Sequence, residues 1–178
     1  MLFRSIGRSG QSPYVDSHLV FNPDWGDDLK AWLDQVAHVG EYVAHLGWTE
    51  AGFLESHDRY RELVQWGVKF STNSDGSIYR RPAMLGPTKT LFMPPMAVPD
   101  ALREQMRLRK VRLFNRTMIF DLIRQNGRVI GALGVSTWKD DISLVEFRAR
   151  AVILACGASG LMGPQWPIHM LTGDGDAM

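Results

Sequence analysis

Hydrophobic residues recur at three- and four-residue steps in the first half of the chain, a spacing typical of helices that bury one face. Over residues 28–46 this pattern predicts an amphipathic helix, with Gly47 as its C-cap. A second helix is predicted to begin near Ser56, a residue suited to an N-cap, and to end before Gly67. A short strand is predicted next, over residues 68–70. The amino-terminal part is therefore expected to be mainly helical.

A long irregular segment separates this helical part from the rest of the chain. Five prolines occur from Pro82 to Pro99, and the first four lie within a predicted proline-rich loop over residues 71–98. Loops of this length are often functional. A third helix is predicted over residues 99–109, because proline suits the first turn of a helix and basic residues suit its carboxyl end.

After Lys110 the apolar residues recur at every second position, a spacing typical of strands. Strands are predicted over residues 111–114, 117–124 and 128–135. Asn126 and Gly127 lie between the last two, and an Asn-Gly pair is a strong signal for a tight hairpin turn. This part is expected to form an antiparallel β-meander.

Two further strands of different character are predicted after the hairpin. Apolar and charged residues alternate over residues 144–151, as in a half-buried antiparallel strand. Residues 152–155 are continuously apolar, as in a parallel strand that is covered on both faces. The order of elements predicts an α/β nucleotide-binding fold with amino-terminal helices and an inserted meander.

Composition and charge narrow the class of protein. The 178 residues are 45% hydrophobic and 22% charged, which is typical of a globular domain. The 20 basic and 19 acidic residues nearly cancel, so no global field attracts nucleic acid or an anionic membrane. One cysteine, Cys156, excludes an internal disulfide. We expect a cytoplasmic protein without a membrane segment, a metal site or a nucleic acid partner.

Two glycine-containing turns near the end of the chain are candidates for a ligand site. The predicted strand 152–155 leads into Cys156 and Gly157, and small residues at the carboxyl edge of a sheet let a ligand approach the backbone. Asp174 lies in a second turn, Thr172-Gly-Asp-Gly175, where a helix entry suits polar or anionic ligand groups. Taken separately, each motif is also explained by an ordinary tight turn.

Together the two turns resemble the FAD-binding domain of the succinate dehydrogenase and fumarate reductase flavoprotein family. Members carry Ala-Thr-Gly-Gly at the first turn and Thr-Gly-Asp-Gly-x-Ala-Met at the second, and this chain ends with Thr172-Gly-Asp-Gly-Asp-Ala-Met178. The family's meander pattern is similar to Asp121-Leu-Ile123, followed by the Asn126-Gly127 turn. The resemblance is strong over residues 109–178 and looser over residues 27–70.

The resemblance implies FAD as the cofactor, bound by residues from three places in the chain. The start of the hairpin would meet the adenine, the first turn would pass close to the dinucleotide, and the second turn would contact FAD directly. The implied cofactor-binding residues are Met118, Ile119, Ala155, Cys156, Gly157 and Asp174. Cys156 replaces the family's usual threonine, and we interpret it as a small buried hydrophobe rather than a redox thiol.

Some features of a complete flavoprotein are missing from the chain. No Gly-x-Gly-x-x-Gly pyrophosphate motif follows a predicted strand. The family's catalytic arginine, substrate histidines and capping domain would lie beyond Met178, so no catalytic residue is assigned. The proline-rich loop over residues 71–98 lacks the family's glycine- and histidine-containing stretch, so a dicarboxylate substrate is not supported.

The sequence thus predicts a partial FAD/NAD(P)-binding Rossmann-like fold from an internal fragment of an FAD-dependent oxidoreductase. The parent protein would transfer hydride to or from a small organic substrate, with an electron partner that the sequence does not identify. The expected parts are a helical part over residues 27–70 and the proline-rich loop over residues 71–98. A helix with the meander is expected over residues 99–150, and a parallel strand with the FAD-contacting turns over residues 151–178. The alternative is a truncated, non-catalytic chain with a structural or interaction role and no cofactor.

Overall fold

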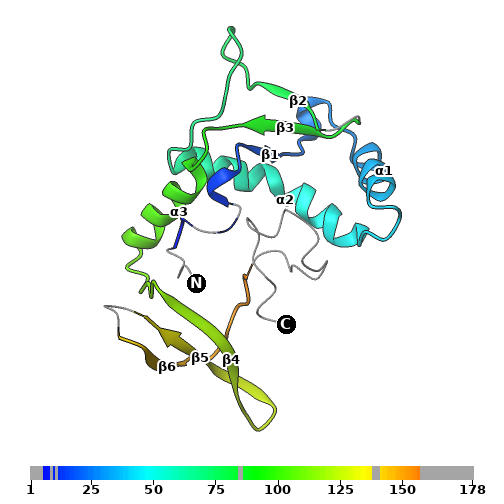
Figure 1. Cartoon of the computed structure of the whole chain (residues 1–178). Coiled ribbons are helices and arrows are strands. Elements are labelled where there is room, and N and C mark those ends of the chain that lie inside the picture. Colours follow the sequence, from blue (N-terminus) through cyan, green and yellow to red (C-terminus); the bar gives the residue numbers. More distant parts are fainter. Residues whose placement is uncertain (1–5, 9, 11, 84–85, 138–140, 157–178) are drawn as a thin grey trace, which may run out of the picture. The chain divides into compact units, whose positions relative to one another are not determined.

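The computed structural model divides the chain into two compact units (Figure 1). Unit 1 comprises Met1–Pro13 with Met106–Met178, and unit 2 comprises Tyr14–Gln105. Each unit is described separately below. The structure describes residues 6–8, 10, 12–83, 86–137 and 141–156.

Unit 2 contains a small antiparallel sheet and the described helices. Its strands have the order β1-β3-β2, so that β3 pairs with both neighbours. Two short 3-10 turns, η1 and η2, flank β1, and α3 runs across the boundary into unit 1. The elements are η1 (Ser12–Tyr14), β1 (Ser17–Leu19), η2 (Pro23–Trp25), α1 (Leu29–Val39), α2 (Leu46–Gln65), β2 (Arg80–Pro82), β3 (Lys89–Phe92) and α3 (Ala97–Leu108).

Helix α1 is shorter than the sequence pattern predicts. It begins after Asp28, whose side chain accepts a hydrogen bond from the Ala31 N–H at 2.9 Å, and it ends at Val39. Glu41 and Tyr42 then adopt left-handed backbone angles, with φ of 50° and 62°. The predicted single helix over residues 28–46 is therefore wrong, because a left-handed pair of residues cannot continue a right-handed helix.

Helix α2 begins ten residues before the predicted position, Ser56. His45 caps it by accepting a hydrogen bond from the Trp48 N–H at 3.2 Å, so Gly47 lies in the first turn of α2 and is no C-cap of α1. Ser56 lies inside the helix and donates to the carbonyl of Phe53. The predicted end before Gly67 is confirmed.

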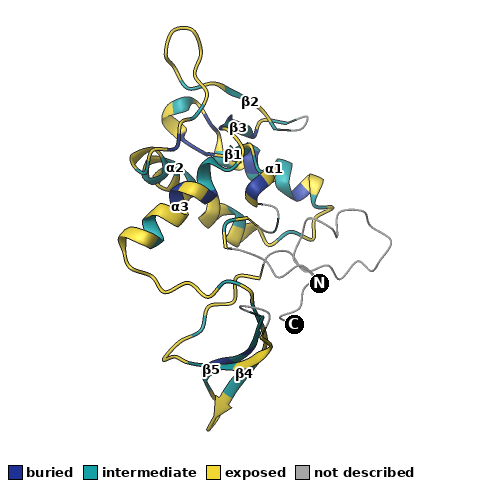
Figure 2. Ribbon diagram, turned by 60° about the vertical axis from the view of Figure 1, so that its left-hand side comes forward, coloured by how far each residue is buried: buried dark blue, intermediate teal, exposed yellow. Residues whose placement is uncertain are grey.

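Two hydrophobic clusters form the core of unit 2. In the first, the edge-on rings of Phe21 and Phe53 pack against Trp32, with centroid distances of 5.4 and 5.1 Å. In the second, Val68 and Met93 pack with Ala101 of α3. Buried residues concentrate around β1, β3, α1 and α3 (Figure 2). The predicted strand over residues 68–70 does not form, and this segment packs as irregular backbone.

Unit 1 contains the predicted meander as an antiparallel sheet with the order β4-β5-β6. The hairpin turn at Asn126 and Gly127 is confirmed, and both residues have positive φ, as such turns require. The predicted strand over residues 111–114 does not form. The bounds are β4 (Thr117–Gln125), β5 (Arg128–Ser136) and β6 (Ser143–Arg148).

The parallel strand predicted over residues 152–155 is absent from the structure. The backbone there forms no strand, and the Ile153 side chain is 90% exposed. A parallel strand needs a neighbour in register, and within the described residues every ladder is antiparallel. The described part is thus a mixed α/β structure with two small antiparallel sheets, and it contains no parallel Rossmann-like sheet.

Candidate functional site

The start of β4 holds two of the residues that were predicted to meet a cofactor. Met118 lies opposite Val135 and Ile119 lies opposite Gly134 in the ladder with β5. Met118 is half-buried, whereas Ile119 is exposed. Because β4 is the first strand in the order β4-β5-β6, no described strand covers its outer edge. Every second residue of an antiparallel edge strand turns its N–H and C=O groups away from its partner, which leaves them available to a ligand.

Gly134 shapes this part of the hairpin by close packing. A Cβ atom at Gly134 would lie 2.9 Å from Ile119 Cδ1 and 3.0 Å from the Met118 carbonyl oxygen. The register also shifts between Ile119 and Asp121, which leaves Phe120 as a bulge. A bulge re-aims the side chains beside it. The close packing at Gly134 and the bulge at Phe120 therefore both lie beside the exposed Ile119 side chain.

The first glycine-containing turn is described only at its beginning. Ala155 and Cys156 are exposed and belong to no helix or strand. The interpretation of Cys156 as a buried hydrophobe is wrong for the described structure, because the strand that would bury it does not form. Gly157 and Asp174 lie outside the described residues. Met118 and Ile119 are neighbours in β4, and all six cofactor assignments stay predictions.

A buried polar cluster in unit 2 was not predicted from the sequence. The Asp27 carboxylate accepts hydrogen bonds from the Asn22 N–H at 2.9 Å and from Arg80 Nη2 at 2.5 Å. The side chains of Asp27 and Arg80 are only 1% and 11% exposed. Arg80 also lies over the ring of Trp25, 4.7 Å from its centroid. We refer to Asn22, Trp25, Asp27 and Arg80 as the Asp27–Arg80 cluster.

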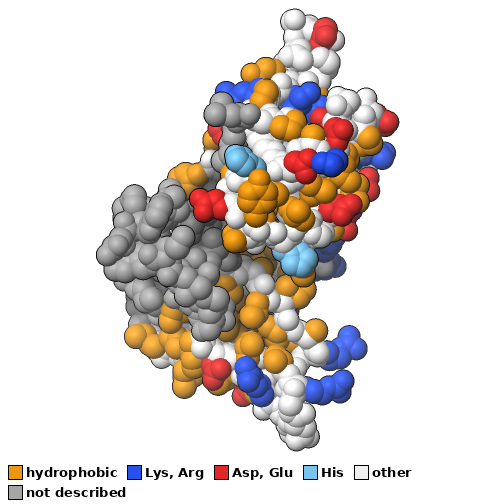
Figure 3. Space-filling view, turned by 90° about the vertical axis from the view of Figure 1, so that its right-hand side faces the viewer, with side chains coloured by type: hydrophobic (Ala, Val, Ile, Leu, Met, Phe, Trp, Pro, Cys, Tyr) orange, Lys and Arg blue, Asp and Glu red, His pale blue; other side chains and the backbone are white. Residues whose placement is uncertain are grey.

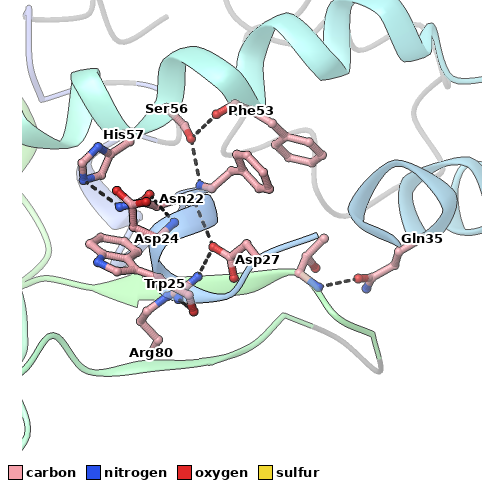
Figure 4. Close-up of polar contacts among 11 residues, drawn as sticks. Asn22, Asp24, Trp25, Asp27, Gln35, Phe53, Ser56, His57 and Arg80 are labelled. Carbon is pink, nitrogen blue, oxygen red and sulfur yellow. Dashed lines mark hydrogen bonds and ion pairs between the residues drawn. The ribbon is translucent and has the colours of Figure 1, made fainter. Parts of the chain in front are cut away.

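This cluster joins β2 and the η2 turn to helix α2 (Figure 4). Asn22 Nδ2 lies 3.3 Å from His57 Nε2, and the rings of Trp25 and His57 meet edge to face at 5.1 Å. The Phe21 N–H donates to Ser56 Oγ at 2.9 Å. A structural role follows, because nearly all of these groups pair with one another. The sequence pattern did not indicate that Asp27 has a partner at residue 80.

His18 is a buried titratable residue in the same unit. Burial lowers the pKa of His18 below its usual value of 6.5. Its Nε2 atom is buried and has no hydrogen-bond partner among the described residues. His18 and Arg80 lie on either side of Leu91 in the ladder, and Leu91 is fully buried, so both side chains are on the covered face of the sheet.

The described residues offer no metal site, since no three His, Cys, Asp or Glu side chains among them gather closely enough to bind an ion. None of the helices in the described ranges combines the length and the apolar character that a membrane span requires.

Comparison with known sequences identifies relatives of which this chain matches about a fifth. A subunit of the fumarate reductase (CoM/CoB) of Methanothermobacter marburgensis is 32% identical over 115 residues, which cover 62% of this chain and 20% of that protein. The succinate dehydrogenase flavoprotein subunit of Rickettsia bellii is 33% identical over 137 residues, which cover 68% of this chain and 22% of that protein. The chain thus spans about a fifth of the length of these relatives.

Comparison with solved structures shows the same fold. The E. coli quinol fumarate reductase FrdA superposes with a TM-score of 0.75 at 19% identity, over 86% of this chain and 27% of that chain. Adenylylsulfate reductase from Archaeoglobus fulgidus superposes with a TM-score of 0.70 at 20% identity, over 89% of this chain and 25% of that chain. The FAD binding domain family matches residues 17–178. The chain therefore belongs to the FAD-binding domain family of succinate dehydrogenase and fumarate reductase flavoproteins.

Proposed function

We propose that this chain supplies part of the FAD site of a flavin-dependent oxidoreductase that acts on a small organic substrate. The observation that carries the proposal is the family match over residues 17–178, which includes the exposed edge at the start of β4. The relatives named above are fumarate reductase and succinate dehydrogenase subunits. Hydride transfer would also use residues that those relatives carry in the part this chain does not span.

The start of β4 fits the adenine end of FAD. Met118 and Ile119 offer apolar side chains, and the edge strand offers backbone donors and acceptors beside them. A flat aromatic ring with polar edges requires this combination. Ala155 and Cys156 would approach the dinucleotide with small, exposed side chains. Gly157 and Asp174 would complete the contacts, as their position in the family motif implies.

The chemistry of these residues indicates which roles belong to this chain and which belong to FAD. When bound, FAD supplies the redox chemistry of hydride transfer. The residues assigned here would bind and orient the cofactor, and no catalytic acid or base is assigned in this chain. This chain would therefore set cofactor affinity, while rate and substrate choice would depend on other parts of the protein.

A titration of the purified chain with FAD tests the proposal. FAD should bind, ADP should displace it, and FMN should not, because the proposed contacts lie at the adenine end, which FMN lacks. Binding is followed by the change in flavin fluorescence. Failure of FAD to bind would favour the non-catalytic alternative, whereas displacement by FMN but not by ADP would contradict the adenine assignment.

Two glycine substitutions provide a matched pair for the same titration. Gly134→Val places a side chain against Ile119 and the Met118 carbonyl, so it should weaken FAD binding about tenfold or more. Gly131→Val also disturbs the sheet, but its added Cβ would overlap the Phe147 carbonyl of β6 on the other side of β5. Equal losses of FAD affinity in both variants would show that general damage to the sheet, and not the start of β4, is responsible.

A further inference from the structure

The connection between α1 and α2 presents large hydrophobic side chains to solvent. Tyr42, Val43 and Trp48 are 78%, 88% and 79% exposed, and Val39 and Leu46 are exposed beside them. Scattered single residues of this kind are common on surfaces, whereas five within ten residues are not. Tyrosine and tryptophan are also the side chains that most often dominate binding energy at protein interfaces. We call this segment the 39–48 loop.

The 39–48 loop is held in shape by its own backbone. The Tyr42 N–H donates to the Ala37 carbonyl at 2.7 Å, and the Val43 N–H donates to the Gly40 carbonyl at 3.0 Å. The left-handed angles of Glu41 and Tyr42 are rare for residues other than glycine, and these bonds maintain them. A surface that is already ordered loses little conformational entropy when a partner binds.

The surroundings of the loop are acidic. Residues 31–58 contain five exposed acidic residues and no lysine or arginine, and one of the five, Asp34, pairs with the neighbouring Lys30. On this side of the molecule, hydrophobic side chains lie among acidic ones, and lysine and arginine side chains are also present (Figure 3). A partner should therefore combine apolar and basic side chains, since charges of the same sign would oppose binding. The acidic residues are Asp34, Glu41, Glu50, Glu55 and Asp58.

A surface with this complementary chemistry occurs in the same chain. Residues 106–116 contain five basic residues and no acidic one, and they also expose large hydrophobic side chains. The Lys110 backbone is fixed in the left-handed region with φ of 54°, and its N–H donates to the Arg107 carbonyl at 3.0 Å. The basic residues are Arg107, Arg109, Lys110, Arg112 and Arg116, and the exposed apolar ones are Leu108, Val111, Leu113 and Phe114.

We propose that the 39–48 loop binds residues 106–116 of a second copy of this chain. The acidic residues around the loop would then meet basic residues such as Lys110, Arg112 and Arg116 around an apolar centre. The contact joins two different surfaces, so it is heterologous and a pair of copies retains one unoccupied surface of each kind. Self-association should increase with protein concentration and weaken as added salt screens the charges. The proposal does not depend on FAD binding.

Charge reversal on each surface tests the contact. Glu50→Lys with Glu55→Lys makes the first surface less acidic, and Lys110→Glu with Arg112→Glu makes the second less basic. Each double variant alone should associate about tenfold more weakly than the unmodified chain. An equimolar mixture of the two double variants should associate again. The first variant keeps its original basic surface and the second keeps its original acidic surface, so these two can bind each other. Sedimentation equilibrium of the full chain over a range of concentrations measures these masses.

The control variant changes the net charge of the chain by the same amount, but at other residues of unit 1. Arg124→Glu with Arg128→Glu alters exposed residues at the far end of the β4–β5 hairpin and should leave association unchanged. Circular dichroism checks that all variants remain folded. A monomeric unmodified chain at every concentration would overturn the proposal. So would a chain that stays monomeric but sediments with phosphatidylserine vesicles, which would identify a lipid surface as the partner of the basic segment.

Discussion

The carboxylate of Asp27 accepts hydrogen bonds from two segments that are distant in the sequence. One donor is the nearby Asn22 N–H and the other is the Arg80 guanidinium, 53 residues away. Asp27 Oδ1 and Arg80 Nε are buried and have no partner among the described residues, so the pair meets through one hydrogen bond instead of two. Removing one member of such a pair leaves a buried charge without compensation.

Arg80→Met should therefore be strongly destabilising. The expected loss is about 3–5 kcal/mol of unfolding free energy, because the Asp27 carboxylate would remain buried and unpaired. Arg59→Met is the matched control, since the Arg59–Glu62 pair is 61% and 39% exposed and screened by water, and it should cost about 1 kcal/mol or less. Urea denaturation midpoints measure both. Similar losses in the two variants would contradict the structural role of Arg80.

His18 should make stability depend on pH. Its folded-state pKa lies below 6.5, so the unfolded chain binds the proton more readily than the folded chain. Stability is then fully present above about pH 6.5 and is lost as the pH falls from that value towards the lowered pKa. His18→Gln should remove this part of the pH dependence. Denaturation midpoints at several pH values between about 5 and 7.5 test it, and identical slopes for both proteins would rule it out.

At the scale of elements, Gln35 of α1 forms hydrogen bonds to both ends of the connection between β2 and β3. Its side-chain Nε2 donates to the Ala83 carbonyl at 3.1 Å, and its Oε1 accepts from the Thr88 N–H at 2.8 Å. A Cβ at Gly86 would overlap the Gln35 side chain, which explains glycine at that position. One amide therefore fixes both sides of this connection to the helix.

Gln35→Leu should destabilise unit 2 by about 1–3 kcal/mol, because it leaves the buried Thr88 N–H without its acceptor. Gln35→Glu retains that acceptor and loses only the donor to Ala83, so a smaller loss is expected. Gln65→Leu, at the exposed end of α2, is the control for the change in side chain. Thermal denaturation followed by circular dichroism ranks the variants. A Gln65→Leu loss as large as that of Gln35→Leu would contradict this assignment.

Local signals predicted elements well where a few adjacent residues determine the structure. The Asn126-Gly127 turn and both of its strands were confirmed, and α3 was predicted to within two residues at its start. The break after Val39 was missed, because the hydrophobic period continues through the left-handed residues Glu41 and Tyr42. The strand over 152–155 was predicted from its apolar run alone, but a strand also needs a neighbour to pair with.

The candidate site shows the same limit. Met118 and Ile119 were assigned through a family motif, and the structure adds the exposed strand edge and the packing of Gly134 beneath them. The Asp27–Arg80 cluster was missed because its members contact each other only after residues 53 positions apart come together. Sequence periodicity carries no information about pairing over that distance.

At the scale of the whole molecule, the two compact units contain separate sheets. No described strand of the β1-β3-β2 sheet pairs with the β4-β5-β6 sheet. The hydrophobic clusters around Trp32 and Val68 both belong to unit 2. Contiguous parts of a protein often open as separate cooperative units.

Hydrogen exchange should therefore distinguish the two units. Arg80→Met should accelerate amide exchange in β1, β3 and α1, and leave the β4–β5 ladder as protected as in the unmodified chain. Added FAD should instead slow amide exchange in unit 1, at the start of β4. Mass spectrometry of peptides from each unit provides the measurement. Loss of protection in both units to the same extent would show that they unfold together.

The strand order of unit 2 has a consequence for how the chain is synthesised. Among the described strands, β1 pairs only with β3, so Ser17 cannot reach its partner Phe92 until α1, α2 and β3 have left the ribosome. Helices α1 and α2 contain mostly local contacts and can form earlier. The amino-terminal strand must remain unpaired during that interval, when exposed strand edges are open to aggregation. Chaperone dependence during translation should therefore be greatest before β3 emerges.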